Sequence, residues 1–345
     1  MKKADIENRQ QKILYAIIAF YIDTAEPVGS RAISQKFGWD MSPATVRNVM
    51  ADLEEMSLIM QPHTSAGRVP TDKGYRMYVD SLLEPSHLTK DEESLIIKLI
   101  HQGSMDIDSI MQSASRAISI ITNVAGIVLT PRLKRSVFKH IEFIPIDSSR
   151  VLTVLITGSG LVKNSILDLE EMVAKAELSR ISEFLNEELE DMLLGDIKHY
   201  LMRRLLEERD SFYTFLKKAI DILLTPNLLK MEDHLYCEGV TCMMSHPEFR
   251  DMSRARMFLK AFEDKKEFFD LLYEDMEEDG VKVHIGKENT FKDMQDCSIV
   301  TCNYKVNDRI VGALAAIGPT RMEYSKVMST IRYLSQAIGK VLEDF

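Results

Sequence analysis

The chain lacks a hydrophobic run long enough to cross a membrane. Its longest uninterrupted apolar stretch, from Ile13 to Ile22, has ten residues, about half of what a spanning helix needs. A cleavable secretion signal is also missing, because acidic Asp5 and Glu7 follow Lys2 and Lys3 and no small-residue cleavage site comes after the apolar run. We therefore expect a cytoplasmic protein without membrane contacts.

Cysteine is scarce, with four residues among 345. They form two similar C-x4-C segments, Cys237 to Cys242 and Cys297 to Cys302. Zinc ligands usually stand two to four residues apart across a turn. Val-Thr-Cys is instead typical of a strand, where residues five apart lie roughly 16 Å from each other on opposite faces. We interpret these as reduced structural cysteines, with a metal or redox role as the alternative.

Motifs that carry catalysis are missing too. The sequence holds no nucleophile elbow, Walker loop or HExxH motif, and its histidines are scattered without ligand spacing. Gly158-Ser159-Gly160 resembles the start of a phosphate-binding loop, but a strand pattern from Leu161 to Leu169 follows where a helix is required. We read that segment as a hairpin turn, and we expect no enzyme activity, no cofactor and no metal.

An excess of basic residues, common in nucleic-acid-binding proteins, is absent from the whole chain, whose net charge is −10. The charge is unevenly distributed, however. Residues 1–83 carry ten basic and ten acidic side chains, so all the excess acid lies in residues 84–345. A neutral segment with locally projecting Arg and Lys is compatible with specific binding to DNA.

Helical patterns fill this neutral segment. Apolar residues between positions 5 and 23 form one stripe at helical spacing, and Glu26-Pro27 stops the helix. A short helix is expected from Arg31 to Phe37. Ser42-Pro43 then begins a third, because a capping hydroxyl followed by proline is a favourable helix start. Two helices joined by a short turn are therefore predicted.

The third helix has a polar side and is followed by a hairpin pattern. Thr45, Arg47 and Asn48 lie off the buried stripe, near the helix start, where a recognition helix meets base edges. Leu58-Ile59-Met60 predicts a strand, residues 62–68 a loop, and Val69 the returning strand. Thr71 caps a fourth helix. Together these elements predict a winged helix-turn-helix.

A less specific interpretation remains open. Three short helices and a hairpin also occur in domains that bind only protein, and Arg47 and Asn48 could simply be solvated. Their residue types favour DNA, because Arg pairs bidentately with guanine and Asn with adenine in the major groove.

Three segments resemble the family of heat-inducible transcription repressors (HrcA). They are Val28-Gly29-Ser30-Arg31, Ser42-Pro43-Ala44-Thr45-Val46-Arg47-Asn48 and Gln61-Pro62-His63-Thr64-Ser65-Ala66-Gly67-Arg68-Val69-Pro70-Thr71, continuing to Gly74-Tyr75-Arg76. The resemblance is strong over the first 83 residues and more diffuse beyond, through Gly318-Pro319-Thr320-Arg321-Met322. Two positions depart from the family pattern: Val49 replaces an acidic residue, and Ser57 replaces a glycine.

The resemblance implies a homodimer that binds double-stranded DNA at an inverted-repeat operator upstream of chaperone operons. It also implies repression that is released on heat stress, and a GroEL-type chaperonin as modulator. A GAF-like second domain with an inserted dimerisation domain is implied as well.

We assign the DNA-contacting roles as follows. Thr45, Arg47 and Asn48 would read bases, and Arg31 and Ser42 would contact phosphate. On the wing, His63, Thr64, Ser65 and Arg68 would contact the backbone or the minor groove.

Helix and strand patterns continue through the remainder of the chain, so we predict a multidomain α+β fold. Residues 1–83 form the winged helix-turn-helix domain, 84–171 and 251–345 a discontinuous GAF-like domain with an α/β sheet, and 172–250 an inserted, mainly helical dimerisation domain. Tyr236 to Met244 is predicted as a strand. Two other functions stay open: a regulator that responds to a small ligand through the GAF-like domain, and an enzyme with an accessory DNA-binding domain.

Overall fold

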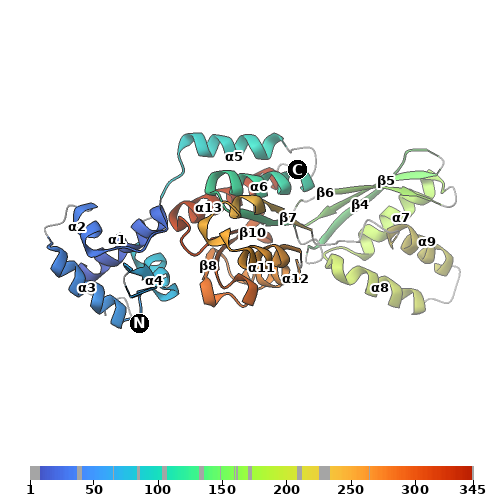
Figure 1. The fold of residues 1–345 in the computed structure, drawn as a ribbon. Helices are drawn as coiled ribbons and strands as arrows, with labels where there is room; N and C mark the ends of the chain where they lie inside the picture. The colour runs from blue at the N-terminus through green and yellow to red at the C-terminus, as the bar shows by residue number, and fades with distance from the viewer. Residues whose placement is uncertain are drawn as a thin grey trace. The chain divides into compact units, whose positions relative to one another are not determined.

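The computed structural model (Figure 1) describes most of the chain. The described residues are 8–36, 41–64, 66–83, 86–102, 107–131, 136–147, 149–158, 160, 162–169, 173–207, 212–224, 234–263 and 265–343. Among them, no helix combines the length and the apolar character that crossing a membrane requires.

The N-terminal part is a small domain of helices with a two-stranded wing, which we call the winged-helix domain. Its elements are α1 (Asn8–Thr24), α2 (Ser30–Lys36), α3 (Pro43–Glu55), β1 (Ile59–Met60), β2 (Val69–Pro70), α4 (Asp72–Met77) and the short helix η2 (Tyr78–Leu82). Strands β1 and β2 pair antiparallel. The predicted order of helices and wing is confirmed.

Local signals fix both ends of α3. Ser42 caps its start by accepting a hydrogen bond from the Thr45 N–H at 3.1 Å, and Pro43 follows at the first helical position. At its end, the Leu58 N–H bonds to the Leu53 carbonyl and the Ser57 N–H to the Glu54 carbonyl, both at 2.9 Å. This Schellman arrangement requires a left-handed residue, and Ser57 supplies it with φ +60°.

A five-stranded sheet with the order β7-β3-β10-β9-β8 forms the centre of a second region, the sheet domain. Its strands are β3 (Ala125–Leu129), β7 (Leu235–Glu238), β8 (Val281–Ile285), β9 (Cys297–Val306) and β10 (Arg309–Pro319). In Figure 1, α5 (Lys90–Gln102) and α6 (Ile107–Thr122) lie on one side of these strands, and α11 (Met252–Glu263) and α12 (Lys266–Asp275) on the other. The remaining elements are α10 (Val240–Met243), η4 (Pro247–Arg250), η5 (Gly286–Glu288), η6 (Lys292–Met294) and α13 (Tyr324–Glu343).

A separate three-stranded antiparallel sheet packs against helices. Its strands are β4 (Phe138–Pro145), β5 (Arg150–Thr157) and β6 (Val162–Asp168), and the helices are α7 (Lys175–Glu188), α8 (Leu194–Glu207) and α9 (Phe212–Leu224). Strand and helix residues share one hydrophobic core, which includes Ile141, Leu155, Ile181, Ile197 and Leu216.

The chain divides into two compact units. The first comprises residues 1–128, 235–302 and 314–334, and the second comprises 129–234, 303–313 and 335–345. The strands at 138–168 share their core with α7 to α9, and β7 belongs to the five-stranded sheet. The expected domain bounds, with an insert at 172–250, stay a prediction. Mixed helix and sheet in more than one unit confirms the predicted multidomain α+β class.

The prediction of one strand from Tyr236 to Met244 is wrong. Strand β7 ends at Glu238, Gly239 has φ +77°, and residues 240–243 form the short helix α10. A Cβ at Gly239 would lie 1.8 Å from the Ser119 hydroxyl of α6, so only glycine fits at the point where the strand ends. The left-handed Gly239 ends the strand, and the helical turn that follows overrides the strand propensity of Val240 and Thr241.

Candidate nucleic-acid interface

Helix α3 presents an open polar surface. Val46, Val49, Met50 and Leu53 are buried, and the side chains of Arg47 and Asn48 are exposed on the other side. Within the residues that the structure describes, neither side chain makes a hydrogen bond or ion pair. A long cationic side chain and a free amide are thus available to an external partner.

The two hydroxyls at the start of α3 serve the helix itself. Ser42 Oγ lies 3.0 Å from Thr45 Oγ1 in addition to its bond from the Thr45 N–H. Ser42 is exposed and Thr45 is half-buried. Their assigned contacts with phosphate and bases stay predictions, and binding there would involve hydroxyls that already bond to each other.

The wing between β1 and β2 is closed by a glutamine. Gln61 Nε2 donates to the carbonyls of Thr64 and Ala66, both at 3.0 Å. His63 and Thr64 are exposed at the tip, whereas Ser65, the other residue assigned there, lies outside the described residues. The closed loop therefore offers small polar groups beside α3.

A third segment pairs with the wing at its base. The Val28 N–H donates to the Arg68 carbonyl and the Arg68 N–H to the Val28 carbonyl, each at 2.8 Å. Gly67 permits this approach, because a Cβ there would lie 2.5 Å from the Val28 carbonyl carbon. The segment before α2 and the wing consequently form one rigid element.

The side chain of Arg68 is engaged within the domain. Its Nη2 lies 2.8 Å from Glu54 Oε2, and its Nε donates to the same oxygen at 2.9 Å. This pair joins the wing to α3, and the sequence patterns did not indicate it. The role of Arg68 at DNA stays a prediction, but part of its charge is neutralised by Glu54.

Other basic side chains of the domain differ in availability. Lys36 pairs with Asp23 at 3.0 Å, and Lys73 donates to the Met56 carbonyl at 2.8 Å, close to the end of α3. Arg31 is exposed, and no partner is found for its side chain among the described residues. Arg31 and Arg47 are therefore both available to an external anion, and their contacts with DNA stay predictions.

Two of the four cysteines have thiols that burial keeps protonated. Burial raises the pKa of Cys237 to about 11 and that of Cys297 to about 12. Such thiols are poor nucleophiles and poor metal ligands near neutral pH. Among the described residues, no group of three or more His, Cys, Asp or Glu side chains could hold a metal ion.

A polar cluster outside the interface stabilises the sheet domain. Asp275 Oδ2 lies 2.8 Å from His284 Nε2 and accepts a hydrogen bond from Thr301 Oγ1 at 2.5 Å. Burial opposes ionisation of Asp275, but these bonds and nearby Lys282 together keep its pKa below the ordinary value. We read the cluster as a link between α12, β8 and β9.

Comparisons with known proteins agree with this geometry. Residues 5–81 match the family model "Winged helix-turn-helix transcription repressor, HrcA DNA-binding", and residues 108–328 match "HrcA protein C terminal domain". A heat-inducible transcription repressor HrcA from Geobacter sulfurreducens is 40% identical over 98% of this chain and 99% of its own length. One from Pelotomaculum thermopropionicum is 38% identical, over 98% and 97%.

A solved structure supports the fold. The crystal structure of a hypothetical protein at 2.2 Å resolution aligns with a TM-score of 0.67 at 20% identity, and the alignment covers 99% of both chains. The two family models together match well over half of the chain, and the full-length relatives share more than a third of its residues. The chain belongs to the family of heat-inducible transcription repressors, HrcA.

Proposed function

We propose that this protein represses chaperone operons by binding an inverted-repeat operator as a homodimer, and that heat stress releases it. The observation that carries the proposal is the pair of exposed, unengaged side chains Arg47 and Asn48 on a Ser42-capped helix beside a closed wing. A helix with this polar surface fits the major groove, where Arg and Asn discriminate guanine and adenine.

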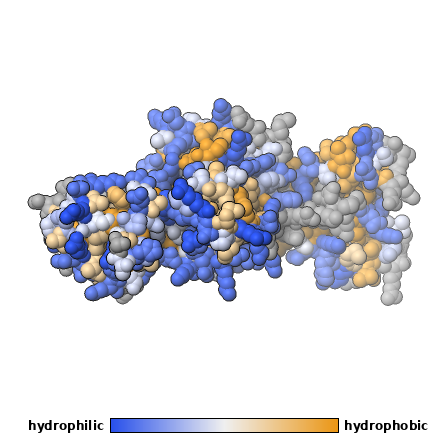
Figure 2. All heavy atoms as spheres, viewed as in Figure 1, coloured by the Kyte–Doolittle hydropathy of each residue, from blue (hydrophilic) through white to orange (hydrophobic). Residues whose placement is uncertain are grey.

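Two copies are needed to read an inverted repeat, because the symmetry of such an operator mirrors that of a dimer. The second unit exposes apolar side chains that support an interface there. On the outer surface of its three-stranded sheet, Ile144, Leu152 and Ile166 lie side by side through the β4-β5 and β5-β6 registers. Ile144 is 45% exposed and Ile166 is 56% exposed. Patches of hydrophobic residues on the visible surface appear orange in Figure 2.

Heat release is supported by composition. The chain holds 20 methionines, whose flexible side chains fill cores without specifying them tightly. We expect operator affinity and native structure to fall together on mild warming, and a GroEL-type chaperonin to restore both. Full operator binding after warming, without chaperonin, would contradict this part of the proposal.

The direct test is a band-shift titration of the full chain with an inverted-repeat duplex from a chaperone-operon promoter, against a scrambled duplex of equal length. We expect preference for the inverted repeat, and weaker binding to both duplexes as salt rises. Equal affinity for both duplexes would remove the proposal. A parallel measurement of molar mass should give a dimer, and Ile166→Lys should shift it toward the monomer.

A further inference from the structure

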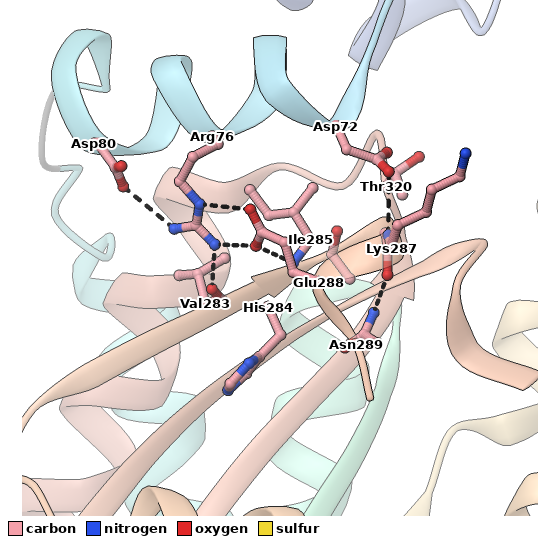
Figure 3. Close-up of polar contacts among 12 residues, drawn as sticks. Asp72, Arg76, Asp80, Val283, His284, Ile285, Lys287, Glu288, Asn289 and Thr320 are labelled. Atoms are coloured by element: carbon pink, nitrogen blue, oxygen red, sulfur yellow. Dashed lines mark hydrogen bonds and ion pairs between the residues drawn. The ribbon is translucent and has the colours of Figure 1, made fainter. Parts of the chain in front are cut away.

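Helix α4 of the winged-helix domain is joined to the sheet domain by an arginine (Figure 3). The Arg76 guanidinium donates from Nε to Glu288 Oε1 at 3.0 Å, and from Nη2 to Glu288 Oε2 and the Val283 carbonyl. Its Nη1 also lies 3.2 Å from Asp80 Oδ1. A planar guanidinium that bonds both oxygens of one carboxylate fixes orientation as well as distance.

The carboxylate of Glu288 is itself held in place. It accepts a hydrogen bond from the Ile285 N–H at 2.9 Å. Burial disfavours its charge, yet the bonds from Arg76 and Ile285 and the charge of Arg76 hold the pKa of Glu288 below its usual value. Glu288 is therefore ionised and oriented toward Arg76 at neutral pH.

A second contact lies one turn away on the same helix. Asp72 Oδ2 accepts a hydrogen bond from the Lys287 N–H at 3.1 Å. Gly286 has φ +53°, and a Cβ there would lie 2.4 Å from Asp72 Oδ1. The buried Asn289 donates to the Gly286 carbonyl at 2.9 Å. The loop after β8 is thus shaped to receive the first turn of α4.

A third contact involves the end of α1 in the winged-helix domain. Arg321 Nη1 donates to the Ile22 carbonyl in the last turn of α1 at 3.0 Å, while its Nε and Nη2 donate to the two carboxylate oxygens of Glu248. The Arg321 side chain is 12% exposed. This gives a physical role to the Gly-Pro-Thr-Arg-Met segment, whose meaning the sequence did not reveal.

Aromatic rings fill the space between these contacts. Tyr75 of α4 is buried, and its ring centroid lies 5.9 Å from that of Tyr324 at the start of α13. Burial, followed by the influence of Tyr324, raises the pKa of Tyr75 well above its ordinary value. We call the contacts of Arg76, Asp72, Arg321 and Tyr75 with the sheet domain the domain seam.

We infer that the domain seam positions the recognition helix α3, with Arg76 and Arg321 acting as positioning residues that set how the two half-sites of an operator are read together. The inference rests on the proposed function, because it assumes a dimer on an inverted repeat. None of the seam residues is among the proposed DNA contacts. The seam acts on DNA binding by holding the winged-helix domain in one orientation on the sheet domain.

The physical reason is effective concentration. When one α3 of a dimer has bound its half-site, the second binds as an intramolecular partner, and its local concentration depends on how rigidly it is held. If the contacts of the seam are weakened, α3 samples a wider range of orientations, and the local concentration of the second α3 at its half-site falls. Affinity for a single half-site does not depend on this and stays unchanged.

Variants on the sheet-domain side of the seam give the sharpest test. Glu288→Gln and Glu248→Gln, combined in the full chain, remove the ion pairs without altering the winged-helix domain. Each also removes a negative charge, so simple electrostatics predicts tighter binding to DNA. The seam predicts the opposite change in affinity. The double variant should bind the native inverted repeat at least about fivefold more weakly than wild type, and should bind an isolated half-site equally well.

The spacing between half-sites separates positioning from a general loss of structure. Wild type should lose affinity steeply as base pairs are inserted between the half-sites, whereas the double variant should show a flatter dependence. The matched control combines Glu263→Gln and Glu277→Gln, which removes the same two charges from exposed residues without a side-chain partner among the described residues. It should keep the wild-type spacing profile.

A steric variant provides an independent check. Gly286→Ala places a methyl group against Asp72 without changing any charge, and should reproduce the flatter spacing profile.

Wild-type affinity and wild-type spacing dependence in both seam variants would overturn the inference. A wild-type chain that ignores the inverted repeat would instead overturn the proposed function, so the two failures are distinguishable. Reduced affinity of both variants for a single half-site would also overturn the inference about the seam, because the seam would then act on the fold of the winged-helix domain.

Discussion

The backbones of Val28 and Arg68 exchange two hydrogen bonds of 2.8 Å, which join the segment before α2 to the wing. These residues stand 40 positions apart in two of the segments that carry the family resemblance. The pairing gives both segments a structural role, because the backbone at Val28 holds the base of the wing at Arg68 through two hydrogen bonds. The wing is therefore fixed to the helices that it accompanies at DNA.

Gly67→Ala should disrupt this pairing. The new methyl group would lie 2.5 Å from the Val28 carbonyl carbon, so the wing must shift, at a cost of roughly 1–3 kcal/mol in the free energy of unfolding. Urea denaturation measures that cost, and operator affinity should fall with it. Gly29→Ala is the matched control, since nothing lies within 4 Å of its Cβ. Equal effects from both substitutions would refute the packing argument.

Ser57→Gly should stabilise the protein. Ser57 has φ +60° at the end of α3, a conformation that costs a residue with a Cβ about 1–2 kcal/mol. Glycine gains flexibility in the unfolded chain, which offsets part of this relief. We therefore expect the free energy of unfolding, measured with heat or urea, to rise by about 0.5–1 kcal/mol, with unchanged DNA binding. Ser30→Gly, at the first residue of α2 where φ is not positive, should bring no such gain. A loss of stability in Ser57→Gly would show that its hydroxyl matters more than backbone strain.

Arg47→Ala should change sequence preference more than overall binding to DNA. A bidentate contact with a base is worth about 1–3 kcal/mol of discrimination. Titration against the operator and a scrambled duplex should show the larger loss on the operator. Arg68→Ala, by contrast, should weaken both duplexes to similar extents. Identical loss of specificity in the two variants would defeat the separate roles assigned to them.

Arg68 and Glu54 should be energetically coupled. Both side chains are partly exposed, at 24% and 36%, and pairs of this kind contribute up to about 1 kcal/mol. A double-mutant cycle with Arg68→Ala and Glu54→Ala, measured by urea unfolding, should reveal coupling of that size that decreases at high salt. Strictly additive effects would mean that the pair does not stabilise the wing.

Asp275 should make the stability of the sheet domain pH-dependent. Its pKa is lowered in the folded state, so the stabilisation is complete above the ordinary aspartate pKa of about 3.9 and is lost as the pH falls below it. The difference in unfolding free energy between wild type and Asp275→Asn should therefore be constant near pH 5 and shrink toward pH 3. A difference that stays constant over this range would show that the carboxylate charge has no part in the link to Thr301 and His284.

Local signals determined much of the winged-helix domain from sequence alone. Ser42 and Pro43 start α3, Thr71 caps α4 by accepting a hydrogen bond from the Gly74 N–H at 3.1 Å, and the apolar stripe of Val46, Met50 and Leu53 is buried as its spacing predicts. These features depend on neighbours within one or two turns. A sequence displays such neighbours directly.

Contacts between distant segments were decided only by the tertiary structure. No sequence pattern relates Arg76 to Glu288, which is 212 positions away, or indicates that Arg321 holds the end of α1. The same applies to Gly239, whose left-handed conformation and close approach to Ser119 mark the end of the strand before α10. Periodicity and capping report energies within a segment, whereas these pairings depend on surfaces that meet only once the segments have folded.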